Sequence, residues 1–336
     1  MYLFRLIFFT FLIFASFISK ASVLDEVKKR GYLKCGVSEP TIGFSNIDDL
    51  GNWKGFDVDI CKAIAAAIFG NTNQVEFVQT TNRSRFPVLF SGEVDVLSRV
   101  TTWTFSRDVN LEFEFTDINF FDGQAFMVKS SLNLTTAKDL DGSSVCVIEN
   151  TSTKKNIDNF FNKNKIKYIP IFIDLNDEAL ESFVADRCDV YSNYVTELIK
   201  VRINLPNSSN YKILPEIISK EPLAIVVRHG DDNWRDVVSW SFKVMLIAEE
   251  LNINSTNVDM YKETTNGEIM RLLGLVGAYG DMIELDEKWA YNIIKYVGNY
   301  KEIYERNLGP ETIVNLERGL NNLYNNGGLL YAPPFR

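Results

Sequence analysis

Two neighbouring threonines and an arginine shortly after them are the side chains best suited to bind a small anion. They lie in residues 100–116, VTTWTFSRDVNLEFEFT, where Arg107 follows Thr102 by five positions. A guanidinium group pairs with a carboxylate through two parallel hydrogen bonds. The threonines also precede a predicted helix start, where free backbone N–H groups favour an anion. The alternative is an ordinary helix cap followed by a solvated arginine.

The surrounding segments alternate between predicted strands and helices. Short apolar runs flanked by turn residues predict strands, and longer amphipathic runs predict helices. The pattern occurs once before residue 100 and again after residue 142, and such alternation builds a parallel α/β sheet. We predict strands at 32–38, 74–80, 94–99, 143–149, 167–173 and 188–193, and helices at 55–70, 85–92, 153–164, 176–187 and 233–251.

Two extended apolar segments lie between and after these units, at 123–131 and 219–230. They indicate that the chain leaves one lobe, builds a second and then returns. The length of 336 residues also favours two domains. After the return, residues 250–336 are mostly helical by pattern, with breaks at Gly274, Gly277 and Gly280.

The N-terminus has the layout of a secretory signal peptide. A basic start (MYLFR) precedes the apolar run LIFFTFLIFASFI and a small residue, which predicts cleavage after Ala21. The apolar run is short for a membrane span, which needs about 20 residues, but an uncleaved anchor is the alternative. The remaining chain has 33 basic and 44 acidic side chains, a formal charge of −11. This charge argues against nucleic acid and anionic membrane surfaces as partners.

Four cysteines remain after cleavage, and an even number in an oxidising compartment predicts two disulfides. They are Cys35, Cys61, Cys146 and Cys188. Three pairings are possible, of which Cys35–Cys61 with Cys146–Cys188 is the most local. Zinc is the rival interpretation, but the chain has no CxxC motif and one histidine, His229. We therefore expect no metal and no cofactor.

An ordered set of segments resembles the periplasmic solute-binding proteins of general L-amino-acid ABC transporters, in the family of bacterial extracellular solute-binding proteins type 3. The resemblance covers residues 22–336. The segments are GNWKGFDVDICKAIAAAIFG, SGEVDVLSRVTTWTFSRD, FFDGQAFMV, AKDLDGSSVCV, RCDVY, LPEIISKEPLAIVVRHGDDNW and YAPPFR.

The resemblance implies an α/β, two-lobed periplasmic-binding-protein fold of type II with two crossing hinge strands. Lobe 1 would comprise residues 22–123 and 224–336, and lobe 2 residues 124–223. A small amino-acid-like ligand would be enclosed between the lobes, and membrane ABC permease subunits would recognise the closed form. We expect a periplasmic monomer without enzymatic activity.

The resemblance also assigns roles to residues. Arg107 and Thr102 match the family's carboxylate-binding pair, and Val100 lies where a backbone carbonyl meets the ligand ammonium. From the second lobe, the ENTST segment would supply hydroxyl and N–H donors to the carboxylate, although these residues also suit a helix cap. That segment contains Thr151, Ser152 and Thr153.

Tyr194 departs from the family pattern. Relatives usually carry an aspartate five residues after the aspartate of CDV, here Asp189, and that carboxylate accepts the α-ammonium. A phenol is neutral at pH 7 and offers only a hydrogen bond or a cation–π face. The ligand could lack a free ammonium, Glu149 or Glu197 could substitute, or the alignment could be shifted by one residue. We favour a real substitution that alters ligand choice.

Further lining residues are expected from the first lobe, each with a simpler structural interpretation. They are Ser38 and Thr41 (turn chemistry), Phe44 (core packing) and Arg85 (a solvated face). Arg99 would form a salt bridge within the lobe or contact an acidic ligand side chain. The enzyme alternative is a dehydratase related to the cyclohexadienyl (arogenate) enzymes of this fold, with Glu149 or Tyr194 as the acid.

Overall fold

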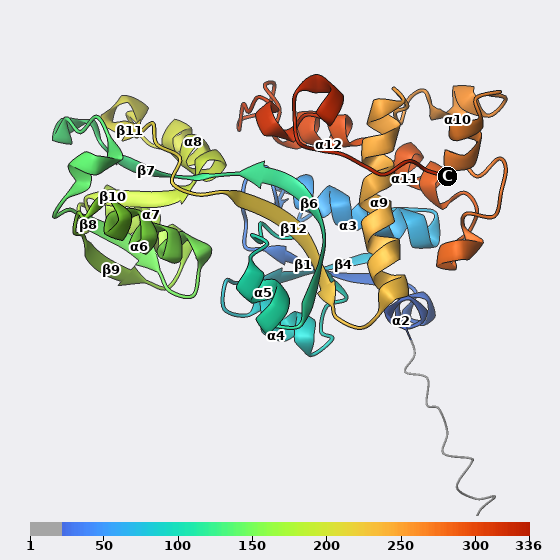
Figure 1. Cartoon of the computed structure of the whole chain (residues 1–336), viewed down its shortest axis with the longest axis horizontal. Coiled ribbons are helices and arrows are strands. Elements are labelled where there is room, and N and C mark those ends of the chain that lie inside the picture. Colours follow the sequence, from blue (N-terminus) through green and yellow to red (C-terminus); the bar gives the residue numbers. More distant parts are fainter. Residues whose placement is uncertain (1–21) are drawn as a thin grey trace, which may run out of the picture.

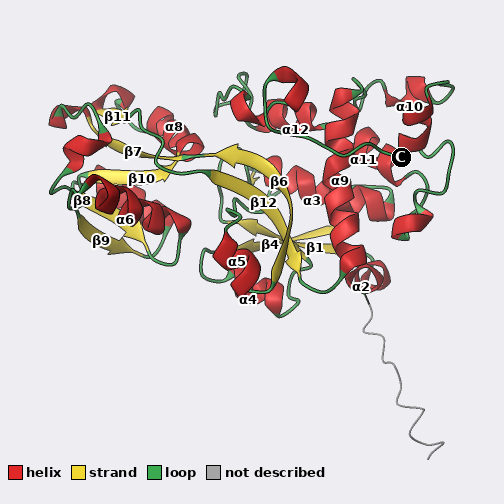
Figure 2. Cartoon of the chain, in the orientation of Figure 1, coloured by secondary structure: helices red, strands yellow, loops and turns green. Residues whose placement is uncertain are grey.

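The computed structural model describes residues 22–336, apart from the side chains of residues 176 and 177. The predicted signal peptide, residues 1–21, lies outside the described residues. The described chain forms two α/β lobes, each built around a five-stranded sheet (Figure 1). Helices lie against both sheets (Figure 2). The predicted two-lobed fold is confirmed.

The sheet of the first lobe has the order β4-β1-β5-β12-β6. Strand β1 pairs in parallel with β4 and β5, whereas β12 pairs antiparallel with β5 and β6. The strands are β1 (Leu33–Ser38), β4 (Val75–Thr80), β5 (Val96–Leu97), β6 (Phe113–Asp122) and β12 (Glu221–Arg228), with a separate pair β2 (Asn46–Ile47) and β3 (Trp53–Lys54). The third predicted strand is thus only two residues long, and β6 was not predicted at all.

The sheet of the second lobe has the order β11-β7-β10-β8-β9. Strand β8 is parallel to β9 and β10, and β7 is antiparallel to β10 and β11. The strands are β7 (Gln124–Lys129), β8 (Ser144–Ile148), β9 (Ile169–Ile173), β10 (Val190–Tyr194) and β11 (Tyr211–Ile213).

The described chain contains the five helices predicted with bounds, and it contains further helices, such as Val195–Asn204, that were not predicted. The helices are α2 (Val23–Arg30), α3 (Phe56–Phe69), α4 (Arg85–Phe90), α5 (Phe105–Asn110), α6 (Ser152–Asn164), α7 (Asn176–Val184), α8 (Val195–Asn204), α9 (Asp232–Glu250), α10 (Gly267–Leu272), α11 (Trp289–Tyr296) and α12 (Tyr300–Asn307). Short 3-10 helices occur at Ser130–Leu132, Ala137–Leu140, Ser208–Asn210, Val258–Tyr261, Asp281–Ile283, Gly319–Asn321 and Tyr324–Asn326.

Helix α3 shows how the sequence sets an element's limits. It begins after Gly55, whose φ of +137° is reserved for glycine and whose added Cβ would lie 2.1 Å from the Phe44 carbonyl oxygen. It ends at Gly70, which adopts the left-handed conformation typical of a helix C-cap. Between them nearly every residue is buried, so the helix is fixed on several sides at once.

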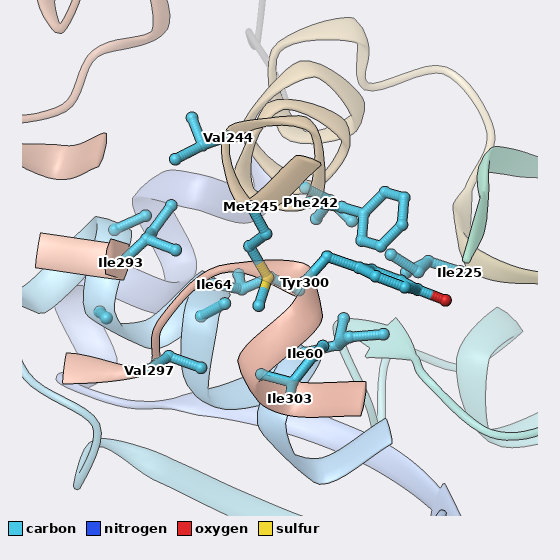
Figure 3. Close-up of a cluster of buried hydrophobic side chains, with 14 of the residues drawn as sticks. Ile60, Ile64, Ile225, Phe242, Val244, Met245, Ile293, Val297, Tyr300 and Ile303 are labelled. Atoms are coloured by element: carbon cyan, nitrogen blue, oxygen red, sulfur yellow. The ribbon is translucent and has the colours of Figure 1, made fainter. Parts of the chain in front are cut away.

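The core of the first lobe extends into the C-terminal helices. Figure 3 shows Ile60 and Ile64 of α3 beside Met245 of α9, with Tyr300 and Ile303 of α12 completing the contact. The predicted helical region after residue 250 therefore buries its apolar face on the first lobe. Each fully buried side chain of this size contributes about 1.5–3 kcal/mol of hydrophobic stabilisation.

The chain passes between the lobes twice. The first crossing joins β6 to β7 at Gly123, and the second joins β11 to β12 through residues 214–220. The two crossings touch, because the N–H of Ile218 donates to the Gln124 carbonyl at 2.8 Å. A Cβ added at Gly123 would lie 2.4 Å from Ile217 Cγ2, so this close approach requires glycine.

Each lobe contains one disulfide. Cys35 of β1 pairs with Cys61 of α3, and Cys146 of β8 pairs with Cys188, which precedes β10. The predicted pair of disulfides, in their most local pairing, is confirmed. No helix within residues 22–336 is long and apolar enough to cross a membrane.

Candidate functional site

A cavity lies between the two lobes, and residues from both lobes line it. The structure brings ten of the eleven predicted ligand-binding residues to this cavity: Ser38, Thr41, Phe44, Arg85, Val100, Arg107, Thr151, Ser152, Thr153 and Tyr194. Thr102 is the exception, since it lies beside the cavity and not in its lining. Residues that are far apart in the sequence thus share one surface.

Ser38 ends β1, and Thr41 and Phe44 follow it, where the chain turns before α3. The Ser38 hydroxyl lies 3.2 Å from Thr41 Oγ1 and 2.6 Å from Ser45 Oγ, so these side chains position one another. Phe44 contacts the rings of Phe56 and Phe120 edge-on, at centroid distances of 6.0 and 5.3 Å. Phe44 therefore belongs to the core and to the cavity wall, and the two interpretations of it hold together.

Val100 has a backbone conformation that a β-branched residue rarely adopts. Its φ is +27°, and its N–H donates to Asp57 Oδ2 at 3.1 Å. Burial raises the pKa of the Asp57 carboxyl to about 6, although hydrogen bonds from Val100 and Ser98 oppose the shift. A strained backbone held by a buried carboxylate is typical of a functional site.

Arg107 is buried, not solvated. It is 8% exposed, and its Nη1 donates to the carbonyl oxygen of Thr102 at 2.7 Å. Helix α5 is indeed capped by a hydroxyl, but the cap is Thr104, whose Oγ1 accepts from the Arg107 N–H at 3.4 Å. The simple alternative of a capped helix with a surface arginine is therefore wrong about the arginine.

Thr102 is part of a polar network at the crossing strands. Its hydroxyl donates to Glu221 Oε2 at 2.5 Å and lies 3.1 Å from the Tyr194 hydroxyl and 3.3 Å from Ser152 Oγ. Glu221 also accepts from Ser152 at 3.3 Å and from the Asn156 amide. Glu221 is 1% exposed. The carbonyl of Thr102 orients Arg107, while its hydroxyl faces Glu221.

In the second lobe, the predicted donors begin helix α6. Thr151 is the N-cap, and its Oγ1 accepts from the Lys154 N–H at 3.2 Å and donates to the Ile148 carbonyl at 2.7 Å. The Thr153 carbonyl accepts from the Gln124 amide at 3.1 Å. The cap interpretation is correct for Thr151, and it is compatible with a position on the cavity.

Tyr194 ends β10 and lines the cavity, with its hydroxyl directed to Thr102. Of the two acids considered as substitutes for the missing aspartate, Glu149 is exposed and does not line the cavity, whereas Glu197 does. Glu197 already accepts from Lys200 Nζ at 2.5 Å. It is therefore a partly neutralised acceptor.

Some lining residues lie outside the predicted ligand-binding set: Glu39 and Asn82 were not considered, and Arg99 and Glu197 were named only as alternatives. Glu39 lies between two predicted positions, Ser38 and Thr41, so its neighbours in the sequence were a usable signal. Asn82 carries no such signal, because it reaches the cavity only through the packing of the segment that precedes α4. Within residues 22–336 no group of three or more His, Cys, Asp or Glu side chains is arranged to hold a metal ion.

Comparison with known proteins assigns the chain to a family. Residues 33–256 match the family model described as bacterial extracellular solute-binding proteins, family 3. The chain is 48% identical over 319 residues to the glutamate/glutamine/aspartate/asparagine-binding protein BztA of Rhodobacter capsulatus, with 95% of this chain and 94% of that protein covered. It is 45% identical over 320 residues to the general L-amino acid-binding periplasmic protein AapJ of Rhizobium johnstonii, again with 95% and 94% covered.

A solved structure is also similar over nearly the whole chain. It is a periplasmic binding protein of an ABC transporter from Brucella ovis with glutathione bound, at 44% sequence identity and a TM-score of 0.90. The match covers 94% of this chain and 100% of that one. The two lobes, the cavity between them and these matches lead to one conclusion: the chain belongs to the bacterial extracellular solute-binding proteins, family 3.

Proposed function

We propose that this protein is a periplasmic receptor that captures an amino acid or an amino-acid-like carboxylate between its lobes and delivers it to an ABC permease. The observation that carries the proposal is the buried guanidinium of Arg107 in a cavity lined by both lobes. A buried cation without an anionic partner is costly, and a ligand carboxylate would offset that cost.

The relatives support the chemical class of the ligand. BztA is named for glutamate, glutamine, aspartate and asparagine, AapJ for L-amino acids in general, and the Brucella ovis protein holds glutathione. All of these ligands carry an α-carboxylate. Their names describe binding proteins, which favours a receptor over the dehydratase alternative.

Other features belong to the same proposal. The signal peptide would be removed after Ala21, and residues 22–123 with 224–336 would move as one lobe against residues 124–223. The mature protein would act as a monomer that meets the permease in its closed form. The contacts at the crossings between β6 and β7 and before β12 support a hinge at these positions.

A thermal-shift panel tests the proposal. The mature protein is heated with each of the 20 amino acids, with their N-acetyl forms and with small carboxylates. We expect amino acids or their close analogues to raise the melting temperature in a concentration-dependent way, since a ligand that binds only the folded state stabilises it. A flat panel, with no shift for any amino acid or analogue, would contradict the proposal.

A further inference from the structure

Three arginine side chains share the cavity between the lobes. They are Arg85 at the start of α4, Arg99 after β5 and Arg107 on α5, and all three line the cavity. Their exposed fractions are only 3%, 4% and 8%. The single α-carboxylate of a neutral amino acid can pair with one guanidinium group. The presence of two more guanidinium groups in the cavity therefore requires a further explanation.

Protein carboxylates offset the charge of these arginines only in part: Asp57 and Glu39 attract Arg99, and Glu221 attracts Arg107. Across residues 22–336, with the side chains of 176 and 177 set aside, no salt bridge involves these arginines. Arg107 donates to a carbonyl, and Arg99 donates to Asn82 Oδ1 at 3.4 Å. The buried Nε atoms of Arg85 and Arg99 have no hydrogen-bond partner among the described residues. Each guanidinium has five N–H groups to satisfy, so most of the donor capacity is unused.

The arginines are close enough to repel one another. The ring of Phe86 lies 4.9 Å from Arg85 Cζ and 5.6 Å from Arg107 Cζ, so one aromatic ring contacts both. Burial and repulsion from Arg99 and Arg107 hold the pKa of Arg85 well below its usual value. Burial lowers the pKa of Arg99 to about 10. Arg99 therefore stays cationic at neutral pH, at an energetic cost to the unliganded protein.

The acids in the lining do not balance this charge. The described acidic side chains on the cavity are Glu39 and Glu197, and Glu197 is paired with Lys200. In the described lining, the three guanidinium groups thus outnumber the two carboxylates. An occupant with a single carboxylate and an ammonium adds no net charge, and it would leave this imbalance in place.

We propose that Arg85 and Arg99 form a second anion subsite, separate from Arg107, and that the preferred ligand carries two carboxylates. The inference rests on the proposed function and narrows it to dicarboxylic amino acids and their conjugates. Arg107 binds the carboxylate that amino acids have in common, and the pair Arg85 and Arg99 binds the second one. A ligand with two carboxylates neutralises more of the buried positive charge than a ligand whose side chain ends in an uncharged amide.

Isothermal titration with L-glutamate and L-glutamine tests the subsite, because these two ligands differ by one charge at nearly equal size. Wild-type protein is expected to bind L-glutamate at least about tenfold more tightly than L-glutamine. Arg85→Gln and Arg99→Gln are each expected to lose most of this preference, with L-glutamine affinity kept within about threefold. Arg235→Gln, which changes a surface arginine of α9, is the control and should leave both affinities unchanged.

The melting temperature of the unliganded variants gives a readout that does not depend on a ligand. Because each of these substitutions removes a buried cation without a salt bridge, we expect the melting temperature to stay unchanged or to rise. If Arg85→Gln and Arg99→Gln lower the melting temperature and weaken the binding of L-glutamate and L-glutamine equally, these arginines stabilise the fold. That result would refute the subsite.

The remaining outcomes separate the subsite from the proposed function. Equal affinity of the wild type for L-glutamate and L-glutamine would refute the subsite and leave the receptor function standing. Binding of L-leucine or L-alanine without binding of either acidic amino acid would also refute the subsite and leave the receptor function standing. If no amino acid or analogue in the panel binds, the proposed function fails, and the subsite fails with it.

Discussion

At the scale of single residues, burial gives Arg107 and Tyr194 roles that their sequence positions alone leave open. Arg107 is oriented by the Thr102 carbonyl at 2.7 Å and is 8% exposed. Tyr194 meets the hydroxyl of the same Thr102 at 3.1 Å. Thr102 thus connects the residue proposed for the carboxylate end of the ligand with the residue proposed for its ammonium end.

Arg107→Ala is expected to weaken ligand binding by about 2–5 kcal/mol, because the ligand carboxylate would lie buried without a charged partner. Titration calorimetry with the tightest amino acid from the panel measures the loss. Arg235→Ala is the matched control, since this arginine lies on α9 away from the cavity. Near-native affinity of Arg107→Ala would show that this arginine does not hold the carboxylate.

Tyr194→Asp introduces the carboxylate that the family resemblance leads us to expect at this position. We expect affinity for free L-amino acids to rise by about 1–3 kcal/mol, because a carboxylate pairs with the α-ammonium more strongly than a phenol does. N-acetyl amino acids, which lack the ammonium, should not gain. Tyr194→Phe separates the loss of the hydroxyl from the gain of charge. An unchanged ranking of ligands would mean that Tyr194 does not decide the ligand class.

At the scale of elements, the two crossings carry two acids next to each other, of which Glu221 is buried and Asp122 is half-buried. Asp122 ends β6 and Glu221 begins β12, and the two residues are partners in the strand register. Asp122 accepts from Thr196 of α8 at 2.5 Å, and Glu221 accepts from Ser152 of α6 at 3.3 Å. Both acids therefore connect the crossing strands to helices of the second lobe.

Burial raises the pKa of the Asp122 carboxyl to about 7, with a smaller contribution from the charge of Glu221. In the unfolded chain an aspartate titrates near pH 4, so between about pH 4 and 7 the folded state holds a proton that the unfolded state has lost. The contribution of Asp122 to stability is thus complete below about pH 4 and is lost as the pH rises through 7.

Asp122→Asn is expected to remove this pH dependence. Its free energy of unfolding relative to wild type should rise between pH 5 and pH 8, by at most about 1.4 kcal/mol per pH unit. Chemical denaturation at several pH values measures the difference. Asp232→Asn, at the exposed start of α9, should show no such trend. A difference between Asp122→Asn and wild type that stays constant with pH would contradict the assignment.

At the scale of the whole molecule, Glu221 links the lobes. Its carboxylate accepts from Thr102 in the first lobe and from Ser152 and Asn156 in the second. A surface ion pair between Arg83 and Asp174 also joins the lobes. The buried network carries more weight than the surface pair, because solvent-exposed pairs contribute little.

Glu221→Ala is expected to weaken closure of the two lobes by about 1–3 kcal/mol, because buried hydroxyl and amide donors lose their acceptor. Small-angle X-ray scattering of the ligand-free variant should give a larger radius of gyration, and ligand affinity should fall with the population of the closed form. Glu76→Ala, on the exposed side of β4, is the control. A radius of gyration equal to wild type in the variant would show that Glu221 does not hold the lobes together.

The sequence by itself determined the α/β class, the two lobes, ten of the residues that line the cavity and the presence of two disulfides, while the choice among three pairings came from the structure. These features depend on local periodicity, on glycine at positions such as Gly55 and Gly70, and on motifs that match a family. The strand β6 escaped prediction because its burial along the chain is irregular, without the alternation that marks a half-buried strand.

Only the tertiary structure decided which charges meet. That Thr102 turns its hydroxyl to Glu221, 119 positions away, and that three arginines line one cavity without a salt bridge to a described carboxylate, depend on how the chain packs. Burial sets the energy of a charge and the direction of its pKa shift, and burial is a property of the folded molecule. The sequence identifies the cationic residues of this site. The fold buries them together, and their burial favours an anionic ligand.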